Sequence, residues 1–555
     1  MSTPHPALKT RDLPSPVLSS VIPSDSLQEA LRQHFNPLQT THPGMLFFAK
    51  SKQQGIFLQL NNEWHLNEFI GDVPFRSGKF SAKVRNSKSE TKDISGYCKI
   101  LHVLDAYRML EGEYPMSQHP ALPCPGIKSA KVFAKLHDPH NQAYVDSNAC
   151  YMLSKFREAE HSPHFSLFYG SYLGIAKKYY YNISEDFSEL RTKSWFWKQL
   201  QKGHFTLVGY YKNVLLPKES PIFKTPECLY DSDSEDSVES LHEFLCEPHI
   251  LSEDLESLAS ASIDTESSHT TETSVTSNFS EILDDDTQIF AVIDQFPTLL
   301  MFLETNTDTL DSLLYNHDRH GTEAWESEWT AWLFQIIAAL CQIQSLWAMT
   351  HNDLHSNNIL WTETDKTHLY YSTLDGRIWK VPTYGKIFRI IDFGRAIYTH
   401  NNVTCISDDY YMENDAGSQY NFGPIYNSEY PTMHPNPSFD LCRLAVSILE
   451  GVFPDIPEEK EDGNILSQEL DRIQKETSSE LYNLLWSWLI DCNGRNVLWD
   501  ADGSERYPGF DLYTVIAQKV KTAVPRDQLD KSIFRKFQTN ENDILDGMKV
   551  YSLFC

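Results

Sequence analysis

The stretch HNDLHSNNILW, residues 351 to 361, places residue types that could support phosphoryl transfer directly ahead of an apolar run. His351, Asp353 and Asn358 follow the pattern H-x-D-x-x-x-x-N. An aspartate can orient an attacking hydroxyl and accept its proton, and an asparagine five residues later can offer an oxygen to Mg²⁺. Taken alone, the pattern is also compatible with an ordinary polar turn before a strand.

A second motif, FRIIDFGRA at residues 388 to 396, makes this chemistry more specific. Asp392 follows a short apolar run, as expected where a strand ends in a turn, and Gly394 would allow the backbone to turn sharply. Asp392 would hold Mg²⁺ that bridges the phosphates of a nucleotide. The two motifs, 39 residues apart, predict an ATP- and Mg²⁺-dependent site with Asp353 as the base and Asn358 and Asp392 as metal ligands.

Both motifs resemble those of the eukaryotic-type protein kinases. Other stretches are similar to the serine/threonine kinases of large nucleocytoplasmic DNA viruses, the giant viruses and iridoviruses: WKVPTYGKIFRIIDFGRA, NQAYVDS, SPHFSLFYGS and NGRNVLWDADGSERYPGFDLY. The resemblance runs from about Ala130 to Phe537, apart from an acidic insertion. It implies an α+β, bilobal protein kinase-like fold, with a small β-rich N-lobe that carries one key helix and a larger, mostly helical C-lobe.

The resemblance also implies a lysine that contacts the nucleotide phosphates and an acidic partner on the next helix. Lys135 in the strand-like KVFAKL matches that lysine best, and Lys131 on the same strand face is the reserve candidate. The zone expected to hold the partner, NACYMLSK, contains no acid. Asp146 could substitute for it, with a surface or helix-capping role as the alternative.

The segment LLMFLETNTDTLDSLL resembles the hinge that joins the two lobes. Glu304 and Thr305 would present backbone groups to adenine, and Leu303 would take the gatekeeper place. The alternative is a strand end with no ligand. The segment PSFDLCRLAVSIL resembles a C-lobe helix of the kinases, which implies that its aspartate, Asp440, pins the backbone of the loop around Asp353.

Several positions depart from the kinase pattern. Asn352 stands where many kinases have an arginine that grips a phosphate, which predicts activity that does not depend on such a phosphate. His355 replaces a lysine and, if it assists transfer, predicts a faster reaction on mild acidification. The segment GDVPFRSGKF offers only Gly71 and Gly78 as a phosphate-covering loop, and no A-P-E triplet follows Gly394.

The expected layout has five parts. These are a loose tail over 1–44, an N-lobe with an N-terminal extension over 45–216, an acidic, Ser/Thr-rich disordered insertion over 217–286, the last N-lobe strand and hinge over 287–310, and the C-lobe over 311–555. Within the N-lobe, YCKILHVLDAYRMLEG has a helical pattern. After the hinge the chain reads mostly helical to its end.

Charge and composition restrict the partners. A net charge of −29 argues against nucleic acid and anionic membranes as partners. The 17 acidic residues between Asp231 and Asp286, with no Lys or Arg among them, form an arm that could contact basic proteins or carry phosphoacceptors, with a solvated linker as the alternative. Ten cysteines without metal-ligand spacing are typical of reduced thiols in a cytosol-like compartment.

No membrane segment is expected. Residues 330 to 350 are apolar, but three glutamines within them favour a buried helix over a membrane span. The first residues lack the pattern of a secretory signal. With the viral resemblance, this predicts a location in the cytoplasm of an infected host cell or in the virion.

The function predicted from these motifs is phosphoryl transfer from ATP to serine or threonine hydroxyls of proteins. Asp353, His355 and Asn358 would be catalytic, and Lys135, Asp146 and the hinge residues would bind ATP. Two alternatives remain. The loop DLHSNNIL also resembles those of small-molecule phosphotransferases, and the incomplete glycine loop and missing helix glutamate would suit a pseudokinase scaffold.

Overall fold

The computed structural model describes residues 18–19, 24–48, 59–114, 121–123, 134–212, 214–218, 220–224, 287–314, 321–400, 402–411, 414–420, 434–468, 473–500, 502–544 and 548–555. Nearly all of the predicted acidic insertion and the first part of the predicted tail lie outside these residues. Within the tail, Asp25–Arg32 forms a helix, α1, and Phe35–Gln39 forms a strand, β2. Leu27 and Leu31 on one face of α1 are fully buried, so the prediction of a loose tail is wrong for this stretch.

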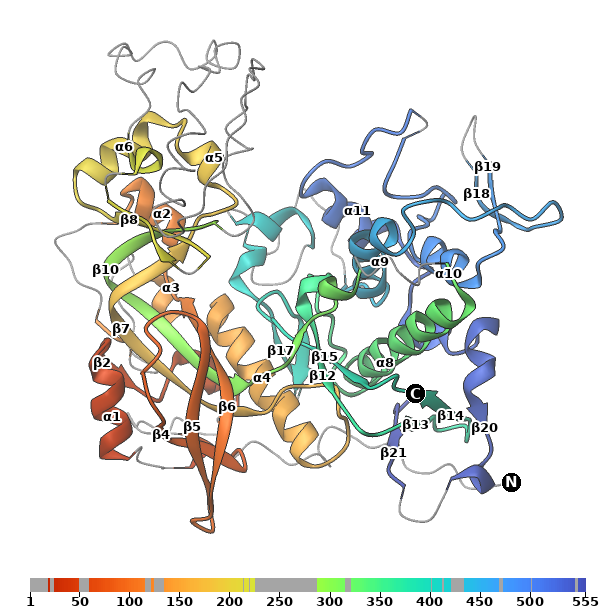
Figure 1. Ribbon diagram of the computed structural model, residues 1–555, viewed down its shortest axis with the longest axis horizontal. Helices are drawn as coiled ribbons and strands as arrows, with labels where there is room; N and C mark the ends of the chain where they lie inside the picture. The colour runs from red at the N-terminus through yellow and green to blue at the C-terminus, as the bar shows by residue number, and fades with distance from the viewer. Residues whose placement is uncertain are drawn as a thin grey trace, which may run out of the picture.

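An antiparallel sheet of eight strands dominates the first part of the chain (Figure 1). Its strands are β2, β4 (Trp64–Phe69), β5 (Gly78–Asn86), β6 (Thr91–His102), β7 (Phe168–Asn182), β8 (Thr206–Tyr211), β9 (Val214–Leu215) and β10 (Thr287–Glu304). The main path runs β2-β7-β10-β6-β5-β4, and β8 joins β10 to β9. Because β10 is a nearly unbroken apolar run, it can be buried on both faces in the middle of the sheet.

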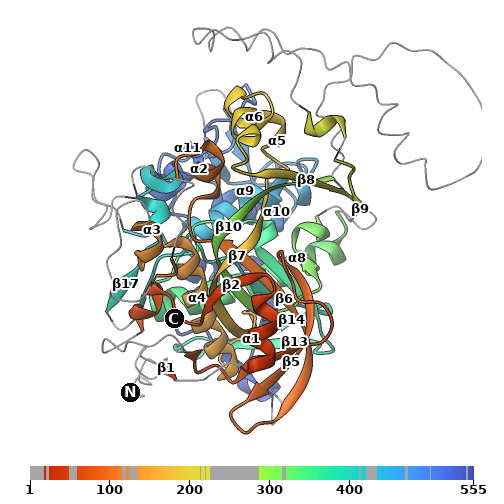
Figure 2. The ribbon, with the colours of Figure 1, turned by 90° about the vertical axis from the view of Figure 1, so that its left-hand side faces the viewer.

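Helices lie next to this sheet in the view from the left-hand side of Figure 1 (Figure 2). They are α1, α2 (Ala106–Glu111), α3 (Ala134–His137), α4 (Gln142–Glu158), α5 (Phe187–Leu190) and α6 (Ser194–Gln201). The side chain of Asn141 caps the start of α4 by accepting a hydrogen bond from the backbone N–H of Ala143. Most of α4 is buried, including Asp146, so this helix fixes polar groups inside the protein.

The second part of the chain surrounds α8 (Glu323–Trp347), the longest helix described. Thr322 caps its start, and Ala348, with a φ of 47°, ends it. The 18-residue window of α8 that is apolar enough to cross a membrane is 89% buried inside the protein. The prediction of a buried helix over this segment is therefore confirmed.

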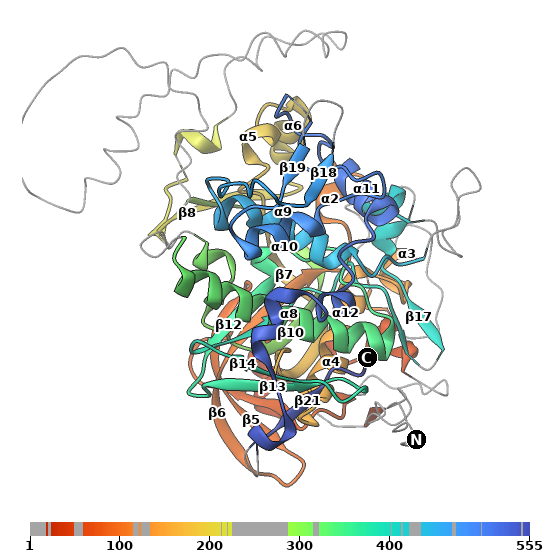
Figure 3. The ribbon, with the colours of Figure 1, turned by 90° about the vertical axis from the view of Figure 1, so that its right-hand side faces the viewer.

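Further helices and many short strands make up the rest of this part of the chain, and some of them contact α8 (Figure 3). The helices are α9 (Phe439–Val452), α10 (Glu480–Trp488), α11 (Asp511–Lys519) and α12 (Pro525–Gln528). The strands are β11 (Asp308–Thr309), β12 (Ile359–Glu363), β13 (His368–Ser372), β14 (Ile378–Pro382), β15 (Lys386–Ile390), β16 (Tyr398–His400), β17 (Val403–Cys405), β18 (Ile465–Gln468), β19 (Ile473–Lys475), β20 (Gln538–Thr539) and β21 (Val550–Ser552). A separate pair joins β1 (Leu18–Ser19) to β3 (Gln59–Leu60).

The predicted fold class, an α+β bilobal protein kinase-like fold, is wrong. The protein has a mixed, strand-rich α/β fold with 33% helix and 30% strand and a curled antiparallel sheet. Over the residues that the structure describes, no bilobal arrangement with a helical C-lobe is evident. The mostly helical reading after the hinge failed because pairings such as Tyr370 with Val550 join distant strands, which local periodicity does not reveal.

Candidate active site

The loop around Asp353 is held by a buried carboxylate on α9. The backbone N–H groups of His351 and Asn352 donate to the carboxylate of Asp440 over 2.9 to 3.1 Å. Burial raises the pKa of Asp440 above its ordinary value, while His351 and these two backbone donors oppose that rise. The predicted contact of Asp440 with the loop backbone is confirmed.

Strand pairing brings the two sequence motifs together. β12 pairs with β15 in an antiparallel ladder, with Ile359 opposite Ile390. The backbone N–H of Ile391 donates to the carbonyl of Asn358 at 3.0 Å, and Nε2 of His351 lies 2.8 Å from the carbonyl of Ile391. Asp392 is the next residue, so the backbones of Asn358 and Asp392 come close to each other where the two strands meet the loops.

The side chain of Asn358 has a defined orientation. Its Nδ2 donates to the carbonyl of Asp353 at 2.9 Å and contacts Nε2 of His355 at 3.0 Å. An amide nitrogen only donates, so Nε2 of His355 accepts and carries no proton. The other amide atom, Oδ1, is an oxygen of the kind that Mg²⁺ prefers.

His355 is held in its neutral form. Burial is the main cause that lowers its pKa below the ordinary histidine value, and the charges of Arg443 and His351 lower it further against the opposing effect of Asp353. The hydrogen bond from Asn358 requires the same neutral state. His355 therefore does not supply the positive charge that a lysine would supply at this position.

Asp392 is joined to a lysine that the sequence analysis missed. Nζ of Lys99 on β6 lies 2.9 Å from Oδ1 of Asp392 and 2.7 Å from Oδ2 of Asp146. Oδ1 of Asp146 accepts a hydrogen bond from the backbone N–H of Phe393 at 2.9 Å. Asp146 therefore links Lys99 to the turn after Asp392. The sequence analysis offered Asp146 as the acidic partner of Lys135, but its lysine partner in the structure is Lys99.

The charges in this cluster stabilise one another. Desolvation disfavours ionisation of Asp392, but the charge and hydrogen bond of Lys99 bring the pKa of Asp392 below its ordinary value. Burial would lower the pKa of Lys99, yet Asp146 and Asp392 together raise it. Asp146 is 1% exposed whereas the Asp392 side chain is 44% exposed, so Asp392 is the member of the cluster that can reach a ligand.

Lys135 lies elsewhere. It is on the short helix α3 rather than on a strand, so that part of the prediction is wrong. Its Nζ contacts Oδ2 of Asp408 at 2.6 Å, and Oδ1 of Asp408 accepts from the backbone N–H of Gln142 at the start of α4. The reserve candidate, Lys131, lies outside the described residues.

Lys99 was missed because residues 97 to 112 were read as one helix. The structure has β6 up to His102 and only then α2, which begins at Ala106. Cys98 and Ile100, the neighbours of Lys99, are buried in the sheet. A lysine between two apolar residues of a strand was the available signal.

The predicted hinge residues have mixed environments. Leu303 is buried at the end of β10, as expected for a residue that limits access. The backbone N–H of Glu304 donates to the carbonyl of Leu167 at 2.9 Å, so it is not available to adenine in this arrangement. Thr305 follows β10, is partly buried, and uses its side chain in a weak 3.5 Å contact with the carbonyl of Asn306.

The carboxylate of Glu304 serves a different purpose. It pairs with Arg389 at 2.9 Å and with Arg157, and it also accepts a hydrogen bond from the backbone N–H of Leu167. Burial would raise the pKa of Glu304, but the two arginines lower it. Burial lowers the pKa of the Arg389 guanidinium to about 10 despite its carboxylate partner. These three side chains tie β10, α4 and β15 together behind the site.

The loop between β4 and β5, residues 70–77, holds Gly71 and precedes Gly78. Gly71 has a φ of +93°, which an L side chain rarely adopts. Ser77 in this loop accepts a hydrogen bond from the backbone N–H of Ile100 at 2.9 Å. The loop therefore touches the strand that carries Lys99.

Asp353 has two neighbours from outside its loop. Oδ1 accepts a hydrogen bond from the hydroxyl of Tyr513 at 2.7 Å, and Oδ2 lies 3.8 Å from Arg395. The Asp353 side chain is 24% exposed, so it sits at the rim of the site rather than in the core. Tyr513 ends the stretch NGRNVLWDADGSERYPGFDLY, but the sequence analysis assigned it no role at the site.

The donor types at this place are those that Mg²⁺ prefers. Mg²⁺ is commonly held by one or two protein oxygens together with substrate phosphates and water. Asn358 and Asp392 provide an amide oxygen and a carboxylate from adjacent strand ends. Across the residues that the structure describes, no group of three or more His, Cys, Asp or Glu side chains forms a self-contained metal site, so phosphates would have to complete the coordination.

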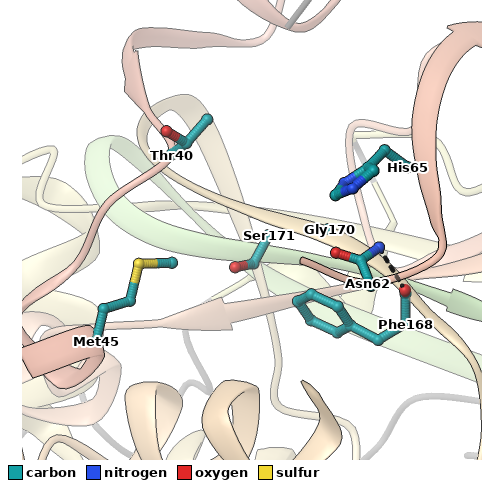
Figure 4. Close-up of a pocket in the computed structure, with 7 residues that line it drawn as sticks. All are labelled: Thr40, Met45, Asn62, His65, Phe168, Gly170 and Ser171. Carbon is teal, nitrogen blue, oxygen red and sulfur yellow. Dashed lines mark hydrogen bonds between the residues drawn. The ribbon is translucent and has the colours of Figure 1, made fainter. Parts of the chain in front are cut away.

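A small cavity lies apart from these residues (Figure 4). It is lined by Thr40, Met45, Asn62, His65, Phe168, Gly170 and Ser171. The side chain of Asn62 donates to the carbonyl of Phe168 at 2.9 Å within it. The cavity shares no lining residue with the cluster around Asp392.

Comparison with models of protein families and with curated proteins finds no match to this chain.

Proposed function

We propose that this chain is an ATP- and Mg²⁺-dependent protein kinase that phosphorylates serine or threonine hydroxyls. The observation that carries the proposal is the Lys99–Asp392 ion pair, supported by Asp146, beside the loop that holds Asp353 and Asn358. The proposal rests on this site and not on the fold class. The resemblance of the two motifs to eukaryotic-type protein kinases supports it. The similarity of other stretches to viral serine/threonine kinases suggests the cytoplasm of an infected host cell, or the virion, as the location.

Each residue has one role in this proposal. Lys99 binds the phosphates of ATP, and Asn358 and Asp392 hold the metal. The metal, when bound, neutralises charge on the phosphates. Asp353 orients the acceptor hydroxyl and takes its proton, while His351 and Asp440 position the loop.

Radiolabelled ATP tests the proposal directly. Purified full-length protein with Mg²⁺ should transfer label to casein or histone, probes that are acidic and basic. Asp353→Asn and Asp392→Ala should each lower the rate at least about a hundredfold, since both act on the transferred group. Because these variants remove activity of the chain itself, they also exclude a contaminating kinase.

The alternatives give different results in the same assay. Nucleotide binding without transfer to protein, water or a small hydroxyl compound would indicate a pseudokinase scaffold. Transfer to aminoglycosides or choline, but not to casein or histone, would indicate a small-molecule phosphotransferase. Either result would reject the protein kinase proposal.

A further inference from the structure

The hydroxyl of Tyr513 lies where an acceptor hydroxyl would have to be. Tyr513 is on α11, 160 residues after Asp353, and its hydroxyl donates to Oδ1 of Asp353 at 2.7 Å. A serine or threonine acceptor must make the same hydrogen bond with the same carboxylate before its oxygen attacks phosphorus. The two hydroxyls cannot occupy this position together.

Tyr513 is held in place by contacts on its other sides. Nε of Arg443 on α9 donates to the Tyr513 oxygen at 2.9 Å, so this oxygen bridges a guanidinium and a carboxylate. The ring of Phe510 stacks on the Tyr513 ring with centroids 4.8 Å apart and an interplanar angle of 10°. Burial is the main cause that raises the pKa of Tyr513, and Asp353 raises it further, so the phenol stays a hydrogen-bond donor.

The second oxygen of Asp353 does not offer an equivalent position. Oδ2 lies 3.8 Å from Arg395, and Nε of Arg395 donates to Asp409 at 2.7 Å. An acceptor that approached Oδ2 would meet this guanidinium, which is fixed by its own carboxylate partner. Oδ1 is therefore the oxygen that an acceptor can use, and Tyr513 covers it.

We propose that the space between Asp353 and Arg443 is the acceptor-hydroxyl subsite, and that Tyr513 occupies it until an acceptor displaces its hydroxyl. This inference rests on the proposed kinase function. The acceptor hydroxyl then donates to Oδ1 of Asp353, and its oxygen accepts from Nε of Arg443. In the transfer, the acceptor oxygen bonds to the γ-phosphorus, the bond from that phosphorus to the β–γ bridging oxygen breaks, the hydroxyl proton passes to Asp353, and ADP leaves.

Removing one oxygen atom tests the subsite. Tyr513→Phe keeps the ring and its stacking but removes the competing hydrogen bond to a charged group. We expect the KM for casein or histone to fall about tenfold with kcat unchanged or higher. Hydrolysis of ATP without an acceptor should also rise, because water can then reach Oδ1 of Asp353.

Controls separate this effect from a change in folding. Tyr507 lies in the same segment as Tyr513, and its ring contacts Lys519. Tyr507→Phe removes a hydroxyl there and should leave KM, kcat and ATP hydrolysis unchanged. Tyr513→Leu should reproduce the fall in KM, and the ATP-induced shift in Tm should show that each variant is folded.

Two outcomes would overturn the inference, and they differ from failure of the kinase proposal. A lower kcat with unchanged KM in Tyr513→Phe would make Tyr513 a positioning residue for Asp353. Unchanged kinetics and unchanged ATP hydrolysis would show that its hydroxyl does not compete with acceptors. If the wild-type protein transfers no phosphate to casein, histone or water, the proposed function fails before the subsite is tested.

Discussion

Lys99 on β6 and Asp392 in the turn that follows β15 form an ion pair of 2.9 Å. The pair joins two segments that no local sequence pattern connects. Asp146 completes it from α4, so three elements converge on one ammonium group. The residue that would contact phosphates is thereby identified by its partners rather than by a motif.

Lys99→Met should abolish transfer, whereas Lys135→Met should not. The first variant removes the cation beside Asp392, and the second removes a partner of Asp408 outside the cluster. We expect a loss of at least about a hundredfold in kcat/KM for Lys99→Met and less than about threefold for Lys135→Met. The measurement is steady-state transfer from labelled ATP, with Tm recorded for both variants. Equal losses would contradict the assignment of Lys99.

Acidification should slow the reaction through His355. Because burial lowers the pKa of His355, the folded state favours the neutral ring. The stability that the neutral ring contributes is present above the ordinary histidine pKa of about 6.5 and is lost as the pH falls through the lowered pKa of the folded state. A protonated Nε2 cannot accept the hydrogen bond from Asn358, so the site is disturbed at low pH. This is opposite in direction to the acid activation that the sequence predicts.

A pH profile of kcat from 5 to 8 checks this expectation. His355→Gln keeps an acceptor for Asn358 that does not titrate, so its profile should lack the acid loss seen in the wild type. An increase in wild-type rate between pH 7 and 6, absent in the variant, would instead support the sequence-based expectation.

Activity should not depend on phosphorylation after Gly394. The side chain of Asn352, at the position of the phosphate-gripping arginine, is uncharged and buried and donates to the carbonyl of Arg395. The guanidinium of Arg395 itself is already paired with Asp409. Asp408 and Asp409 already supply negative charges, to Lys135 and Arg395. Phosphatase-treated protein should keep full transfer activity. A requirement for phosphate between residues 394 and 440 would refute this prediction.

Glu304→Gln should destabilise the fold by about 3 kcal/mol, because it leaves the arginine pair behind the site without a carboxylate. Arg389 is only 7% exposed and cannot recover its hydration. Chemical denaturation of both proteins measures the difference. Because the pKa of Glu304 is lowered in the folded state, its contribution is present above the ordinary carboxyl pKa and lost as pH falls through the folded value. The difference between the two proteins should therefore shrink in acid, and a difference below about 0.5 kcal/mol at pH 7 would contradict the prediction.

The parts of the site that could be predicted are those encoded within a few neighbouring residues. Asp353, Asn358 and Asp392 stand in short motifs, and β12 and β15 bring these motifs together directly. Asp440 was also found, because its segment PSFDLCRLAVSIL resembles a kinase helix. Lys99, Tyr513 and Arg443 reach the site only through sheet pairing and helix packing, which a single sequence does not display.

The fold was predicted less well for the same reason. Short strands such as β13 and β14 are stable only when they are paired with other strands. β13 pairs with β14 and with β21, a strand at residues 550–552. Without knowledge of that partner, the aromatic residues of β13 could not be distinguished from a helix face. The long buried helix α8, whose stability does not need a distant strand, was predicted correctly.

The pairing of β13 with β21 limits how the protein can be shortened for biochemical work. A recombinant fragment cut to the region of family resemblance, Ala130 to Phe537, would lose β21. One edge of β13 would then be exposed, and an exposed strand edge promotes aggregation. The same fragment would also begin after β6 and would lack Lys99. If such a fragment were inactive or insoluble, the cause would be the missing segments, and the result would say nothing about the chemistry of the intact chain.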